Sequence, residues 1–119
     1  MKIQALTPVL WTLNMQETID FYCDRLGFVV NEKKDEWGWA SISNGTVDIM
    51  LSVPNEHMNF EKSMFTGSFY FRIDDVNALY EKLKDQSRIL YPLEDFEWGM
   101  REFAIFDNNG YILQFGQSI

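Results

Sequence analysis

The chain has 119 residues, of which 46% are hydrophobic and 16% are aromatic. This length fits one domain, and the hydrophobic and aromatic content allows a sizeable core and excludes a disordered chain. The formal net charge of -8 argues against a nucleic-acid partner, because phosphate binding needs clustered Lys and Arg side chains. No apolar run approaches the roughly 20 residues that span a bilayer, and the first residues lack a signal-peptide pattern. We therefore expect no membrane partner and a cytoplasmic location.

The first half of the chain predicts a strand, a helix and three further strands. Asn14 followed by Glu17 has the spacing of a helix start, and Gly27 can adopt the left-handed conformation that ends a helix. The dipeptide Asn44-Gly45 is a strong hairpin signal. The strands are predicted over 4–13, 28–32, 37–43 and 46–53.

The second half repeats this order after a stretch without periodicity, 54–66, which predicts a linker. Asp74 and Asp75 are suited to cap a helix over 76–85, and Asn108–Gly110 predicts a turn. The strands are predicted over 68–73, 89–93, 101–106 and 111–116. A repeat of one βαβββ unit indicates a single domain, 1–119, made of two modules, about 1–53 and 67–119, that close a core together.

Two motifs resemble the vicinal oxygen chelate superfamily, which includes glyoxalase I, extradiol dioxygenases and bleomycin resistance proteins. They are PVLWTLNMQETIDFYCDRLGF over 8–28 and WGMREFAIFDNNGYILQF over 98–115, and the latter motif is most similar to the bleomycin resistance branch. The resemblance implies an α+β fold in which two βαβββ modules form a curved mixed sheet with a concave cup. It also implies a homodimer, with clefts completed across the dimer interface.

The resemblance further implies where a metal site would lie. Metal-dependent members place His, Glu or Gln on the first and last strands of each module, and the matching residues here are Thr7, Met50, Ser68 and Gln114. Hydroxyl, thioether and amide groups do not offset the charge of a divalent ion. We therefore expect no metal and no cofactor, although a small shift of register near Met50 would present Asp48 instead.

The sequence offers no pair of nucleophile and base. Cys23 lies in the predicted helix, where a buried and inert thiol is the expected state. His57, the only histidine, lies in the predicted linker and is expected to be exposed to solvent. No catalytic residue can be assigned, so an enzyme is less favoured than a binding protein.

Aromatic and polar residues are predicted to line the cup. By resemblance, Trp98 matches a ligand-stacking tryptophan of bleomycin resistance proteins, although core or interface packing is an equal alternative. Glu94, Asp95 and Glu97 lie near it in the sequence, and carboxylates beside an aromatic face attract planar cations. The expected ligand-binding residues are Thr7, Trp37, Trp39, Met50, Ser68, Tyr70, Trp98, Arg101, Phe103 and Gln114.

These observations favour a protein of the bleomycin resistance type that binds a small aromatic or cationic molecule, without metal and without transforming it. Sequestration of an antibiotic is one such role. The alternative is a metal-dependent lyase, isomerase or dioxygenase of the same superfamily. A third possibility is an interaction module with an empty cup.

Overall fold

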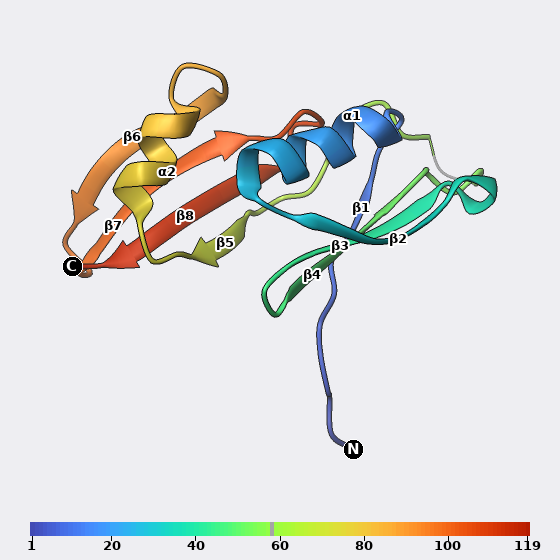
Figure 1. Cartoon of the computed structure of the whole chain (residues 1–119), viewed down its shortest axis with the longest axis horizontal. Coiled ribbons are helices and arrows are strands. Elements are labelled where there is room, and N and C mark those ends of the chain that lie inside the picture. Colours follow the sequence, from blue (N-terminus) through green and yellow to red (C-terminus); the bar gives the residue numbers. More distant parts are fainter. Residues whose placement is uncertain (58) are drawn as a thin grey trace. The chain divides into compact units, whose positions relative to one another are not determined.

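The structure, a computed structural model, describes residues 1–57 and 59–119. Met58, inside the predicted linker, lies outside the described residues. The chain divides into two compact units, Met1–Glu61 and Lys62–Ile119, and the boundary falls within that linker. Each unit has a four-stranded mixed sheet, and the two orders correspond: β1-β4-β3-β2 and β5-β8-β7-β6 (Figure 1). The predicted α+β class with two βαβββ modules is therefore confirmed.

The first unit follows the predicted order with shorter elements. The helix α1 continues as a π-helical turn, Phe21–Arg25, and ends where Gly27 has a φ of 73°. The Asn44-Gly45 hairpin joins β3 to β4 as predicted. The elements are β1 (Val9–Trp11), α1 (Met15–Asp20), β2 (Val29–Lys34), β3 (Trp39–Asn44) and β4 (Val47–Ser52).

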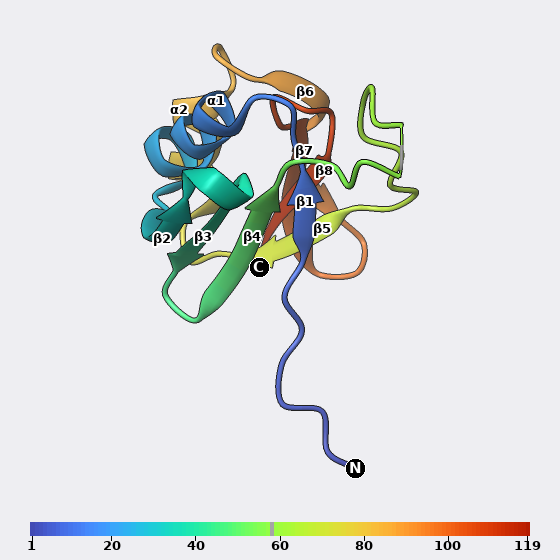
Figure 2. The same cartoon turned by 90° about the vertical axis from the view of Figure 1, so that its right-hand side faces the viewer.

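The first strand is shorter than the predicted range 4–13. Strand β1 begins at Val9, which lies in register with Met50 of the parallel strand β4. Pro8 precedes it and has no N–H to donate to a ladder, although its carbonyl accepts a bond of 2.9 Å from the Met50 N–H. Figure 2 shows the chain before β1 running away from the strands of this unit.

The second unit follows the predicted order, and its largest difference from the predicted bounds is in β6. Its elements are β5 (Phe69–Arg72), α2 (Val76–Leu83), β6 (Arg88–Phe96), β7 (Met100–Phe106) and β8 (Ile112–Ser118). Strand β6 continues three residues beyond the predicted 89–93, with irregular pairing to β7 between Ile89 and Glu94. This extension turns part of the predicted acidic loop into a strand. Only 97–99 remain between β6 and β7.

Each sheet buries one face. In the first unit Ala40, Ile42 and Leu51 are fully buried, and in the second Phe103, Ile105 and Leu113 are fully buried. In β3, β4 and the first half of β8 the buried residues alternate with less buried neighbours, whereas in β7 residues 102–105 are all buried. The opposite face of each sheet presents polar and aromatic side chains, which in the second sheet cover Ala104 and Glu102 of β7. No helix in the described part of the chain is long and apolar enough to cross a membrane.

The two helices begin differently. The Asp75 carboxylate accepts a bond of 3.0 Å from the Ala78 N–H and caps α2, as predicted. The Asn14 side chain does not cap α1, so that prediction is wrong. Two buried threonines hold the start of α1: the Asn14 N–H donates to Thr12 Oγ1, and the Thr18 hydroxyl donates to the Asn14 carbonyl.

We expect Asp75→Ala to lower the free energy of unfolding by about 1 kcal/mol, because it removes a side-chain cap. Asn14→Ala is the matched control and should change it by less than about 0.5 kcal/mol, since the Asn14 side chain caps nothing. Denaturant unfolding of both variants measures the difference. Equal losses would contradict the assignment of the caps.

Candidate functional site

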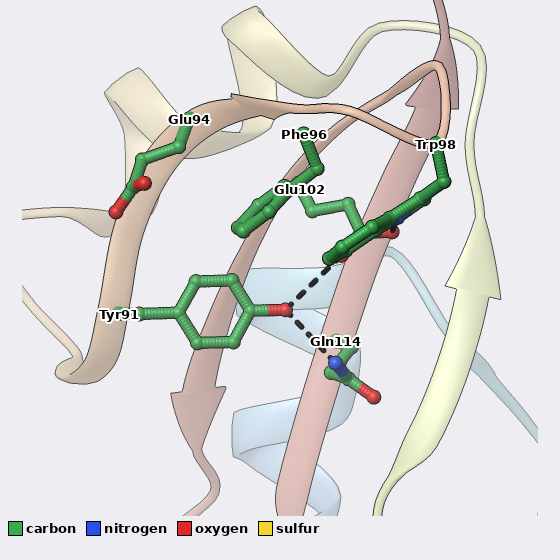
Figure 3. Close-up of a pocket in the computed structure, with 6 residues that line it drawn as sticks. All are labelled: Tyr91, Glu94, Phe96, Trp98, Glu102 and Gln114. Atoms are coloured by element: carbon green, nitrogen blue, oxygen red, sulfur yellow. Dashed lines mark hydrogen bonds between the residues drawn. The ribbon is translucent and has the colours of Figure 1, made fainter.

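A pocket of about 310 Å³ lies on the open face of the second sheet. Figure 3 shows its lining side chains, which come from β6, the turn after it, β7 and β8. The volume lies near the lower end of the range of small-molecule sites, about 300–1,000 Å³. The lining residues are Tyr91, Glu94, Phe96, Trp98, Glu102 and Gln114.

The centre of the site is the carboxylate of Glu102, whose residue is only 4% exposed. Its Oε2 accepts a bond of 2.5 Å from the Tyr70 hydroxyl and one of 3.2 Å from the Trp98 indole N–H. Its Oε1 accepts a longer bond, 3.3 Å, from the Tyr91 hydroxyl. Among the described residues, no Lys, Arg or His lies within ion-pair distance of Glu102. Within the described part of the chain, neutral hydrogen-bond donors alone therefore stabilise the negative charge of the Glu102 carboxylate.

Gln114 is tied into the same network. Its Nε2 donates to the Tyr91 hydroxyl at 2.8 Å, and its Oε1 accepts a bond from the Ser68 hydroxyl. Because the Tyr91 hydroxyl donates in turn to Glu102, a directed chain of donors runs from Ser68 to the buried carboxylate. Such a chain polarises each of its members and fixes their side chains.

The absence of a side chain at Gly116 leaves space for the Tyr70 ring to reach Glu102. Strand β8 lies between β5 and β7, and Gly116 lies in register with Glu102. A Cβ at this glycine would lie 2.0 Å from the Tyr70 Oη and 2.7 Å from its Cζ. The phenol therefore crosses β8 directly over Gly116, and the position requires a residue without a side chain.

The walls of the pocket are aromatic. The rings of Phe96 and Trp98 stack at 4.7 Å between centroids, and Tyr91 meets Phe96 edge-on at 5.8 Å. Trp98 is nevertheless 62% exposed, so most of the indole is accessible. Flat apolar walls above a buried charge and a few hydrogen-bonding groups are the usual composition of a ligand site.

The extension of β6 separates the predicted acidic cluster onto two faces. Glu94 and Phe96 line the pocket, whereas Asp95 forms a two-pronged ion pair with Arg101, at 2.6 and 3.1 Å. The hydrogen bond from the Arg101 guanidinium lowers the pKa of the Asp95 carboxyl. Glu97 is exposed in the turn.

The structure brings four of the ten predicted binding residues into one network: Ser68, Tyr70, Trp98 and Gln114. Arg101 and Phe103 lie on the other face of β7 because Ala104, not Phe103, is in register with Gln114. Phe103 is fully buried between Tyr80 of α2 and Phe115. This placement differs from the predicted lining and follows from the alternation of side chains along a strand.

The other four predicted residues belong to the first unit. Thr7 precedes β1, and Trp37 is 66% exposed in a short 3-10 turn, with the Lys34 ammonium 5.8 Å from its ring centroid. Trp39 and Met50 are half-buried on the open face of the first sheet, opposite the buried Ala40 and Leu51.

Sequence reasoning missed Glu102, Tyr91 and Phe96 as lining residues. Glu102 directly follows Arg101 in the predicted strand 101–106, and no motif marks its side chain as functional. The register of β7 on β8, together with the irregular pairing of β6, decides which residues face the pocket. Only cross-strand pairing contains that information.

The donor set does not fit a divalent metal ion. Hydroxyl, thioether and amide groups occupy the four positions implied by resemblance, and the Gln114 oxygen already accepts from Ser68. No group of three or more His, Cys, Asp or Glu side chains is placed to hold a metal in the described part of the chain. Asp48, the alternative to Met50, is exposed.

Neither Cys23 nor His57 is placed as a catalytic group. Burial raises the pKa of the half-buried Cys23 thiol, and the neighbouring carboxylates of Asp24 and Asp20 raise it further. The thiolate that a nucleophile needs is therefore disfavoured. His57 is exposed, as predicted, and its nearest charged partner is Glu56 at 3.9 Å.

The fold and the site together define a small α+β protein with paired βαβββ units and an aromatic pocket on one sheet. The model of the Glyoxalase/Bleomycin resistance protein/Dioxygenase superfamily matches residues 4–115, and the chain belongs to this family. The resemblance seen in the two sequence motifs is thereby confirmed.

The chain is similar in sequence to bleomycin resistance proteins and similar in fold to several solved structures. The bleomycin resistance protein of Geobacillus stearothermophilus is 27% identical over 128 residues, covering 94% of this chain and 95% of its own. A protein of unknown function from Agrobacterium tumefaciens has a TM-score of 0.82 at 20% identity, covering 100% and 97% of the two chains. A lactoylglutathione lyase from the same organism has a TM-score of 0.76 at 17% identity, covering 96% and 92%. The two structures support the fold alone.

We expect Tyr70 to titrate unusually late, and burial also raises the pKa of its neighbour Tyr91. Burial, and then the hydrogen bond to the Glu102 carboxylate, raise the pKa of Tyr70 to about 12. The folded state therefore favours the protonated phenol. Its contribution to stability is complete below the ordinary tyrosine pKa, about 10, and is lost as the pH rises through about 12. Tyrosinate absorbance should show this late step in the wild type and lose it in Tyr70→Phe. Tyr80→Phe is the control and should keep it; persistence of the step in Tyr70→Phe would contradict the assignment.

Gly116→Ala should destabilise the chain by about 1–3 kcal/mol, because the new methyl group overlaps the Tyr70 phenol. In a Tyr70→Ala background the same change should cost much less, since the overlapping group is gone. A double-mutant cycle of unfolding free energies measures this coupling. An equal cost in both backgrounds would show that Gly116 serves another purpose.

Proposed function

We propose that this protein binds a small aromatic or cationic molecule in the pocket of its second unit, without a metal ion and without transforming it. The observation that carries the proposal is the buried Glu102 carboxylate, which has neutral donors but no cation beside it among the described residues, under a wall formed by Phe96 and Trp98. A buried charge is costly unless it is paired. A bound cation would supply the missing partner.

The relatives named as bleomycin resistance proteins support a role in sequestering an antibiotic or a similar compound. As the family resemblance implies, we also propose that the protein acts in the cytoplasm as a homodimer. The two edge strands of each sheet offer unpaired backbone groups that a second copy can cover.

The alternative is a metal-dependent lyase, isomerase or dioxygenase. The fold of a lactoylglutathione lyase is similar to that of this chain and is compatible with this alternative. The donor set described above argues against it. Thermal unfolding with and without Ni²⁺, Zn²⁺, Mn²⁺ or Fe²⁺ separates the two functions. A stoichiometric metal that raises the unfolding temperature would favour the enzyme.

Calorimetric titration with aromatic probes tests the proposed binding. We expect naphthylmethylamine to bind, and Trp98→Ala to weaken its binding by about tenfold, because the stacking wall is removed. The matched control is Trp37→Ala, which removes an equally exposed tryptophan from the first unit and should leave binding unchanged.

Three outcomes decide the proposal. Binding of cationic or neutral naphthyl probes that depends on Trp98 supports it. Binding that is equally sensitive to both tryptophan variants contradicts the assigned site. If naphthylmethylamine, naphthylmethanol, naphthylacetate and bleomycin all fail to bind, the protein is better described as an interaction module.

A further inference from the structure

The pocket carries two negative charges. Glu94 of β6 and Glu102 of β7 both line it, and they lie directly opposite each other in the register of the two strands. Like charges in such cross-strand pairs repel. No Lys, Arg or His lines the pocket, and none lies within ion-pair distance of either carboxylate in the described part of the chain. The negative potential of the two carboxylates disfavours an anionic ligand and favours a cationic one.

The polar groups of the pocket offer mainly acceptors. The hydroxyl protons of Tyr70 and Tyr91 and the indole proton of Trp98 all point to Glu102. A carboxylate can accept about four hydrogen bonds. Oε2 already receives two, whereas Oε1 receives one long bond of 3.3 Å and keeps capacity for another. A ligand that fits this surface must itself donate hydrogen bonds, and a quaternary ammonium ion has no proton to donate.

The apolar part of the pocket is flat. Phe96 and Trp98 stack with only 16° between their ring planes, and Figure 3 shows the Glu102 carboxylate behind Trp98, whereas the Glu94 carboxylate points away from the two rings. Planar delocalised cations such as amidinium and guanidinium groups pack on aromatic faces and are weakly hydrated, so their desolvation costs less than that of an ammonium ion.

We infer that the pocket selects a planar nitrogen cation that carries N–H groups, of the amidine, guanidine or protonated amino-heteroaromatic class. The cation donates an N–H to Oε1 of Glu102. The exposed Glu94 carboxylate adds a second negative charge that attracts the cation at the edge of the pocket. This inference rests on the proposed binding function and narrows it to one ligand chemistry, with Glu102 as the residue that determines specificity.

Three single-ring probes test the inference in the full-length protein: benzamidinium, benzyltrimethylammonium and neutral benzamide. The Trp98 indole N–H signal in NMR spectra reports binding beside Glu102, and its loss in Trp98→Phe identifies it. Benzamidinium should shift this signal and bind about tenfold or more tightly than either other probe, because only it combines charge with N–H donors.

Variants separate the contributions of the carboxylates. Glu102→Gln should weaken the binding of benzamidinium by about tenfold or more, while changing the affinity for benzamide by less than about threefold. Glu94→Gln, at an exposed position that tolerates substitution, should weaken the binding of benzamidinium by about two- to threefold. Glu97→Gln is the matched control, since Glu97 is exposed in the same region and does not line the pocket.

The inference is overturned if benzyltrimethylammonium or benzamide binds as tightly as benzamidinium. It is also overturned if Glu94→Gln and Glu97→Gln have equal effects on benzamidinium. In either case binding at the Trp98 site would still support the proposed function. Failure of all three probes, together with failure of the naphthyl probes, would overturn both.

Discussion

The buried carboxylate of Glu102 is the constraint on which the open face of the second sheet depends. Strand β7 withdraws this residue from solvent, so that it is only 4% exposed. An ionised carboxylate withdrawn from water costs several kcal/mol unless hydrogen bonds replace its hydration. Tyr70, Tyr91 and Trp98 supply these bonds from β5, from β6 and from the turn that follows it. The hydrogen bonds to this one carboxylate thus connect β5, β6 and the turn after β6 to β7.

Two backbone features follow from this requirement. Gly116 leaves room for the Tyr70 phenol to cross β8, and its own φ is not in the left-handed region, so space rather than conformation demands a glycine. The irregular pairing of β6 lets Tyr91 and Glu94 both line the pocket although they are three positions apart in the sequence. In a regular strand these two side chains would point to opposite faces.

The sequence predicted the order of the elements well, because turn residues, helix caps and period-two alternation act over a few residues. Asp75 and Gly27 behave as their local patterns indicate. The face that each strand presents was harder to predict. Phe103 was expected in the pocket and lies in the core, because facing depends on pairing with β8, which no local pattern records. Strand β6 was predicted too short because the acidic residues after Leu93 disfavour a strand.

The position of the negative charge distinguishes this pocket from a metal site. Gln114 occupies the position where metal-dependent relatives are expected to place a ligand, yet its amide is bonded on both sides, to Ser68 and to Tyr91. The buried charge lies instead on the neighbouring strand β7, at Glu102, where three donors already occupy most of its acceptor positions. A divalent ion needs several such oxygens at once. One remaining acceptor position suits a single N–H of an organic cation, and this difference favours binding over metal-assisted chemistry.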